Sequence, residues 1–370
     1  MDKTIFSNIG KIIERDSKST TYKFALLRGT IDIIQENSPF IYEKDGRIII
    51  PTGLLIEKWL VYYYPILESE KHIPQINNSK KLKFQTLFDK LIAYYKFRGG
   101  LSVFYNDLRS KGVPDDIRKL FLDLVKSLKK TITDMPMRYI GKSVNNKEYS
   151  IYDFEKNITI KKSIDTDLNG LIMNTGSFSI PIEYYEVFKL LGNFVSGQDS
   201  ILFKWANFSV TNSGGNLKLN DVLEQILKAP TDQRNTTISK NIYENIFKKK
   251  GYVNCVWTGN KIRKYDVDHV IPFSVWKNND LWNLLPTKST TNNNKRDKIP
   301  SPIMIEKQKD LILEYWTIIQ NVQMQRFNKE IQVSLLGNLP SSSWKEIGIN
   351  QLKQSCNYLI ENRGFQEWKI

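Results

Sequence analysis

The stretch of residues 252–300 does more than any other to limit what this chain can fold into. Residues 265–270 and 282–285 are short β-prone runs, and residues 289–298 could form a helix that begins at a hydroxyl residue. Their order predicts a strand, a loop, a second strand and a helix. A unit of this kind is small enough to hold a single metal ion between its three elements.

Three side chains in this stretch have the chemistry of a hydrolytic site. A neutral imidazole can take a proton from water at physiological pH, which makes His269 a candidate general base. Asp268 and Asn292 offer the hard oxygen ligands that Mg²⁺ prefers. Neighbours on a regular strand face opposite sides, so Asp268 and His269 can share a site only if the chain twists or loops there. Pro272 favours such a departure.

The spacing of these residues resembles that of the HNH, or ββα-metal, endonucleases, and most closely the HNH segment of RNA-guided CRISPR effector nucleases. A lone Asp-His pair would more often be structural, but here several residues match at fixed offsets. The matching residues are the Asp268-His269 pair, Asn283 fourteen residues after the histidine, Asn292 twenty-three residues after it, and then Lys295 and Pro300.

This resemblance implies a role for each matching residue. Asp268 and Asn292 would hold Mg²⁺ or Mn²⁺, His269 would activate water, and Asn283 would orient the loop that carries His269. Cleavage would leave 5′-phosphate and 3′-hydroxyl ends. Because Asn292 is the first of three consecutive asparagines, a slip of one residue would exchange the ligand. Asn292 is favoured because it keeps both the Asn-x-x-Lys step and the distance to Pro300.

Two features near the motif leave alternatives open. Asp266 could accept a hydrogen bond from a ligand, but we expect it to be an exposed charge. Many HNH proteins bind a structural zinc through two Cys-x-x-Cys pairs, whereas Cys255 lacks a second thiol beside it. We therefore expect no structural zinc, and we expect Trp257 and Trp282 to hold the unit together by packing.

The charge of the chain favours a polyanionic partner. There are 54 Lys and Arg residues against 39 Asp and Glu residues, a formal net charge of +15. Each single cation could be merely solvated, yet a basic cluster surrounds the motif and would neutralise DNA phosphates. The predicted DNA-binding residues are Lys295, Arg296, Lys264 and Arg263. No apolar run is long enough for a membrane span, so we expect a cytoplasmic protein with no membrane partner.

The remaining sequence predicts a mostly helical N-terminal half. Residues 1–135 have helical periods interrupted by a β-hairpin at residues 40–50, and their aromatic residues recur at helical spacing, which is typical of a core. Residues 136–215 read as a mixed α/β region, and residues 216–370 as a nuclease domain with flanking helices. Residues 16–33 and 203–206 are weakly similar to large bacterial HNH proteins of the restriction and phage-defence type. This similarity implies target recognition or partner binding by the N-terminal region.

The sequence therefore predicts an α+β fold with a helical N-terminal region and a C-terminal ββα-metal module. The expected activity is metal-dependent hydrolysis of double-stranded DNA, in restriction or anti-phage defence. Two alternatives stay open: a DNA-binding subunit that has an HNH fold but does not cleave, and a nuclease toxin without sequence preference. A homodimer is possible, and no guide RNA is implied.

Overall fold

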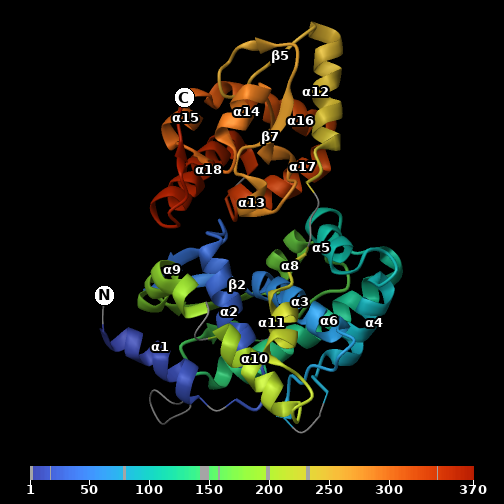
Figure 1. The fold of residues 1–370 in the computed structure, drawn as a ribbon, viewed down its shortest axis with the longest axis vertical. Helices are drawn as coiled ribbons and strands as arrows, with labels where there is room; N and C mark the ends of the chain where they lie inside the picture. The colour runs from blue at the N-terminus through green and yellow to red at the C-terminus, as the bar shows by residue number, and fades with distance from the viewer. Residues whose placement is uncertain are drawn as a thin grey trace. The chain divides into compact units, whose positions relative to one another are not determined.

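The computed structural model describes residues 3–16, 18–77, 81–141, 150–156, 159–196, 201–230, 234–339 and 341–370. The fold is α+β and mostly helical, as the sequence predicts (Figure 1). The chain divides into two compact units. Unit 1 combines Met1–Glu36 with Ile41–Thr231, and unit 2 combines Asn37–Phe40 with Asp232–Ile370. The expected division into three functional regions stays a prediction.

Helices make up most of unit 1, and their apolar faces meet in an aromatic core. Trp59 stacks on Tyr22 with ring centroids 5.6 Å apart, and Tyr63 packs against Trp205 at 5.5 Å. All four rings are buried, so these helical aromatics are core residues. The helices are α1 (Lys3–Arg15), α2 (Tyr22–Gln35), α3 (Thr52–Glu68), α4 (Gln85–Tyr95), α5 (Gly100–Ser110), α6 (Arg118–Ile132), α8 (Leu168–Asn174), α9 (Ile182–Ser196), α10 (Ile201–Asn212) and α11 (Leu219–Leu227).

A small antiparallel sheet of four strands in the order β1-β2-β4-β3 completes unit 1. Strands β1 (Tyr42–Lys44) and β2 (Arg47–Pro51) form the predicted hairpin, which turns at Asp45 and Gly46, both with positive φ. Strands β3 (Asp153–Phe154) and β4 (Ser177–Pro181) extend the sheet beyond β2. The hairpin and the middle of the chain thus share one sheet.

Unit 2 is built from short strands and helices around a second core. Trp257 and Trp282 are both buried there, which confirms their predicted role. The helices are α12 (Thr237–Lys250), α13 (Phe273–Trp276), α14 (Ser289–Lys295), α15 (Pro302–Lys307), α16 (Lys309–Val322), α17 (Met324–Ile331) and α18 (Trp344–Glu361). The strands are β5 (Val253–Asn254), β6 (Lys261–Ile262), β7 (Asp266–His269), β8 (Leu284–Thr287), β9 (Ile299–Pro300) and β10 (Glu367–Trp368).

The predicted strand–loop–strand–helix unit consists of β7, β8 and α14. Strands β7 and β8 pair antiparallel, with Asp268 opposite Leu285. The second strand begins two residues later than predicted because Leu281–Asn283 form a 3₁₀ turn. Helix α14 ends at Lys295, three residues earlier than predicted, where Arg296 adopts a positive φ of 51° that ends the helical repeat. Among the described residues, no helix has the length and apolar character of a membrane span.

Candidate active site

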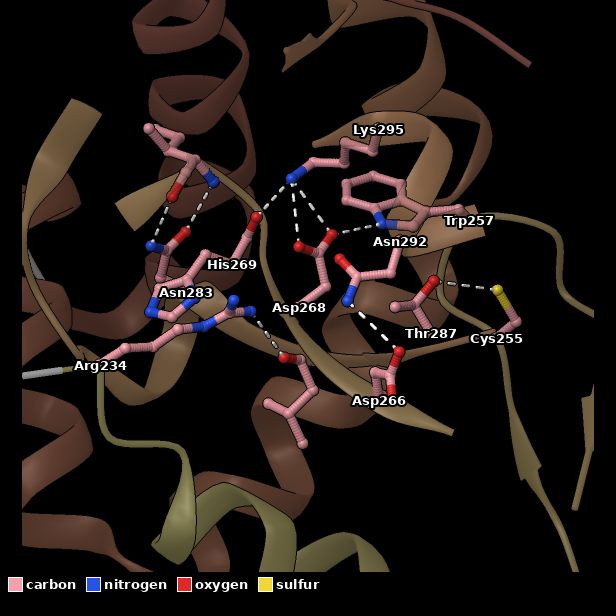
Figure 2. Close-up of polar contacts among 12 residues, drawn as sticks. Arg234, Cys255, Trp257, Asp266, Asp268, His269, Asn283, Thr287, Asn292 and Lys295 are labelled. Atoms are coloured by element: carbon pink, nitrogen blue, oxygen red, sulfur yellow. Dashed lines mark hydrogen bonds and ion pairs between the residues drawn. The ribbon is translucent and has the colours of Figure 1, made fainter. Parts of the chain in front are cut away.

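Strand β7 carries three of the polar side chains that the motif brings to this unit. Asp266 and Asp268 share one face because side chains alternate along a strand. β7 pairs with β8 as far as His269, where the strand ends. The two neighbours point in different directions, Asp268 toward Lys295 and His269 toward Arg234 (Figure 2).

Asp268 forms a buried ion pair with Lys295. The Lys295 Nζ lies 3.1 Å from Oδ2 of Asp268, and it also donates to the carbonyl oxygen of His269 at 2.6 Å. Trp257 Nε1 donates to the same Oδ2 at 3.1 Å. Burial raises the pKa of Asp268 and lowers the pKa of Lys295, and the attraction between their charges opposes both shifts. Lys295 has no exposed surface, which corrects the expectation that it contacts a DNA phosphate.

The imidazole of His269 is buried and chemically available. Its ring packs against Phe273 with centroids 5.4 Å apart, and neither ring nitrogen has a well-formed hydrogen bond to a described residue. Burial, and secondarily the positive charge of Arg234, lower its pKa to about 4, although Asn278 and Asn279 beside the ring oppose that shift. The ring is therefore neutral at physiological pH, with a free lone pair able to accept a proton.

Asn283 ties down the chain that follows His269. Its Oδ1 accepts a hydrogen bond from the backbone N–H of Ile271 at 2.8 Å, and its Nδ2 donates to the carbonyl oxygen of Ile271 at 3.0 Å. The carbonyl oxygen of Asn283 also accepts from the N–H of Val270 at 2.8 Å. These three bonds fix the backbone immediately after His269, so the side chain of Asn283 needs no substrate contact to influence the imidazole.

A surface pocket of about 280 Å³ opens beside β7 and α14. Asp266 and Asn292 both line it, and Asn292 Nδ2 donates to Asp266 Oδ2 at 3.4 Å. Asp266 is only partly exposed and contacts Asn292, the predicted metal ligand. It is therefore not the fully exposed charge that we expected. The lining residues are Arg234, Thr236, Lys240, Tyr265, Asp266, Val267 and Asn292.

The donor groups near this pocket suit a hard divalent cation. The carboxylates of Asp266 and Asp268 and the amide oxygen of Asn292 are the oxygen ligands that Mg²⁺ and Mn²⁺ prefer. The side chains of Asp266 and Asn292 are in contact, through the amide nitrogen of Asn292. Among the described residues, no three His, Cys, Asp or Glu side chains gather into a metal cluster. An ion held here would therefore depend on Asn292 and retain several waters.

The thiol of Cys255 lies inside unit 2. Its Sγ is 3.5 Å from Oγ1 of Thr287 and accepts a hydrogen bond from the backbone N–H of Lys288 at 3.4 Å. Both Cys255 and Cys356 are free and buried. Packing and hydrogen bonds thus surround the thiol.

An ion pair between Glu330, which is buried, and Arg326 supports the loop between β7 and β8. Oε2 of Glu330 accepts a hydrogen bond from the N–H of Leu281 at 2.6 Å, and Oε1 pairs with Arg326 at 2.5 Å. Burial, followed by the nearby charge of Asp280, raises the pKa of Glu330 to about 7. Arg326 also donates to the carbonyl oxygen of Asn279, which lies beside His269. The carboxyl of Glu330 therefore anchors the loop that covers the imidazole.

The other predicted DNA-binding residues lie on the surface. Arg263, Lys264 and Arg296 are all exposed. Arg234 and Lys240 also line the pocket, but they precede the motif and no pattern in the sequence indicated them. The place of Asp266 two residues before Asp268 on a strand was the available signal for its role.

Two family models match this chain over separate ranges. Residues 255–301 match the model described as HNH endonuclease, and this range contains β7, β8 and α14. The match supports nuclease activity and, with it, binding of nucleic acid. Residues 2–226, more than half of the chain, match a model described as a domain of unknown function, DUF8808. The chain therefore belongs to the DUF8808 family and carries an HNH endonuclease segment in its second unit.

Proposed function

We propose that this protein is a divalent-metal-dependent endonuclease that hydrolyses phosphodiester bonds in double-stranded DNA. The observation that carries the proposal is His269: a neutral imidazole without a well-formed hydrogen bond, within the segment that matches the HNH endonuclease model. A buried imidazole without a well-formed hydrogen bond costs stability, since buried polar atoms are normally paired. A catalytic base is a role that would justify this cost.

His269 acts as the general base in this proposal. It accepts a proton from a water molecule, whose oxygen then forms a bond to phosphorus while the bond to the leaving 3′-oxygen breaks. A divalent ion, when bound, supplies Lewis-acid stabilisation of the phosphate and of the leaving oxygen. Asn283 keeps the imidazole in position through its bonds to the backbone at Ile271.

Asp268 and Asn292 are the proposed metal ligands, with Asp266 as a further oxygen donor in the same region. Asp268 already accepts a hydrogen bond from Trp257 on Oδ2 and one from Lys295 on Oδ1, and Lys295 Nζ lies 3.1 Å from Oδ2. A carboxylate has about four acceptor sites, so these bonds leave room for a cation. The positive charge of Lys295 limits how much further charge Asp268 can attract, which makes Asp266 and Asn292 important for the affinity of the site.

The exposed cations of unit 2 suit a DNA substrate. Arg263, Lys264 and Arg296 would neutralise phosphates on either side of the cleaved bond, in keeping with the net charge of +15. Such contacts carry little sequence information. We propose that the DUF8808 region selects the target or a partner, as a restriction or anti-phage defence enzyme would require, either as a monomer or as a homodimer and without a guide RNA.

Incubation of the purified protein with plasmid and phage DNA tests this proposal. Wild type, His269→Ala and the matched control His72→Ala are compared with Mg²⁺ and with a chelator. His72 is the other histidine of the chain and is exposed. We expect discrete Mg²⁺-dependent fragments from wild type and His72→Ala, and at least a 100-fold lower rate from His269→Ala. Cleavage by His269→Ala at the wild-type rate would refute the role of the imidazole.

A second candidate function is a DNA-binding subunit that does not cleave. The observation in its favour is that His269 is only 2% exposed and that Asp268 is paired with Lys295, so both groups have little access to solvent. Retained DNA binding without cleavage under every metal tested would support this alternative. A smear of fragments from all DNA substrates would instead favour a nuclease without sequence preference.

A further inference from the structure

The pocket beside Asp266 and Asn292 has a second wall that lies outside the HNH endonuclease match. Arg234, Thr236 and Lys240 form this wall, from the segment that leads into α12 and from the first turns of that helix. Neither Arg234 nor Lys240 has a role in the hydrolysis proposed above. The pocket nevertheless combines two cationic side chains with the carboxylate of Asp266, so its lining is net positive.

Arg234 is held at the pocket by one contact. Its Nη2 donates to the carbonyl oxygen of Val267 at 3.3 Å. A guanidinium has five N–H donors, so most of its capacity remains available. Figure 2 shows this guanidinium beside the imidazole of His269. An anion bound by Arg234 would therefore lie next to the proposed base.

Lys240 is unpaired within the described residues. Its side chain is exposed and forms no ion pair or hydrogen bond there, and Arg234 likewise has no acidic partner within ion-pair distance. The two cations outnumber the one carboxylate of the lining, Asp266, so the pocket attracts anions. Arginine binds a phosphate through two parallel hydrogen bonds, and lysine adds a point charge. Because both side chains are exposed, a long polyanion can reach them.

We propose that Arg234 and Lys240 form a phosphate-binding subsite that holds one backbone phosphate of the nucleic acid strand next to His269. The proposal rests on the proposed function for the identity of the polyanion. The subsite would bind the nucleic acid backbone irrespective of base sequence and would align that strand in the active site. It would also extend the active site beyond the residues that match the HNH endonuclease model, to the segment before α12.

The salt dependence of DNA binding tests this subsite separately from cleavage. The full chain with His269→Ala is titrated into a fluorescent DNA duplex without divalent metal, at several salt concentrations. Arg234→Gln, Arg234→Lys and Lys240→Gln are added to this background. The control is Lys307→Gln, which removes an exposed lysine of α15 that does not line the pocket. Each lost phosphate contact lowers the slope of log affinity against log salt by about 0.9.

We expect Arg234→Gln and Lys240→Gln each to weaken binding by about tenfold at moderate salt and to lower the slope by about one. Arg234→Lys keeps a cation and should keep the slope, and Lys307→Gln should change neither quantity. Unchanged slopes in both glutamine variants, with or without a loss of affinity, would overturn the subsite. If Arg234→Gln fails to fold by circular dichroism, Lys240→Gln gives the same test, because its side chain is exposed and forms no hydrogen bond or ion pair with a described residue.

The two proposals fail in different ways. A wild-type chain that binds DNA but never cleaves it would refute the proposed nuclease function and leave the slope measurement valid. A wild-type chain that cleaves DNA, with slopes unaffected by Arg234→Gln and Lys240→Gln, would refute the subsite alone. A chain that does not bind the duplex at all would refute both.

Discussion

Gln75 in unit 1 and His269 in unit 2 are buried to nearly the same extent, 3% and 2% exposed, but their surroundings differ. Oε1 of Gln75 accepts hydrogen bonds from Thr21 at 2.9 Å and from Trp205 at 2.8 Å, and its Nε2 donates to Ser209 at 3.1 Å. The ring nitrogens of His269 have no well-formed partner. Gln75 is therefore part of a hydrogen-bond network, whereas the ring nitrogens of His269 remain able to accept a proton.

The presence or absence of hydrogen-bond partners separates polar groups that stabilise a core from polar groups that can take part in a reaction. A missing partner alone is insufficient, because Trp59 Nε1 in unit 1 is also buried without a hydrogen bond. An indole N–H only donates, whereas a neutral imidazole can accept a proton at physiological pH. His269 further lies beside Arg234 and the pocket that contains Asp266. Chemistry and position together single out the histidine.

The largest expected effect on stability is at the ion pair between Asp268 and Lys295. Lys295→Ala should lower the free energy of unfolding by about 3–5 kcal/mol, because it leaves the buried carboxylate of Asp268 without its counter-charge. Chemical unfolding followed by circular dichroism measures the change. Lys298→Ala is the control and should change stability by less than about 0.5 kcal/mol. Equal stability of the two variants would show that the active-site pair has no structural role.

The network around Gln75 should be sensitive in stability alone. Gln75→Ala leaves the hydroxyl of Thr21 and the indole N–H of Trp205 without their shared acceptor and should cost about 1–3 kcal/mol. Unfolding midpoints and the initial rate of DNA cleavage are measured together, with the exposed Gln366→Ala as control. The contrast with His269 breaks down if Gln75→Ala abolishes cleavage in protein that remains folded.

The last expected effect is a change in the pH dependence of stability at Glu330. Its pKa is raised to about 7 in the folded chain, above its ordinary value of 4.5. The folded state therefore binds this proton more tightly than the unfolded state, so stability falls as pH rises from about 4.5 to about 7. Glu330→Gln should remove this contribution and flatten the profile. Unfolding free energies at pH 5 and pH 8 provide the comparison, and parallel profiles would contradict the assignment.

Local patterns in the sequence were enough to predict the strand–loop–strand–helix unit and the hairpin of unit 1. Alternating apolar residues and the turn at Asp45 and Gly46 act over a few residues, so they are readable without the rest of the chain. The burial of Trp257 and Trp282 was predicted because Cys255 lacks a second thiol beside it, which left packing to hold the unit together. The exact start of β8 could not be predicted from local patterns, because the 3₁₀ turn before it contacts Glu330 on α17.

The motif alone determined which residues were candidates, because residue type and spacing fix what chemistry the side chains offer. Only the tertiary structure decided where the atoms of those side chains lie. The ammonium of Lys295 sits at the end of a long flexible stem, and the packing around Asp268 and Trp257 places it inside rather than in water. The pocket beside Asp266 likewise depends on the start of α12, which lines it together with β7 although it lies before the motif in sequence.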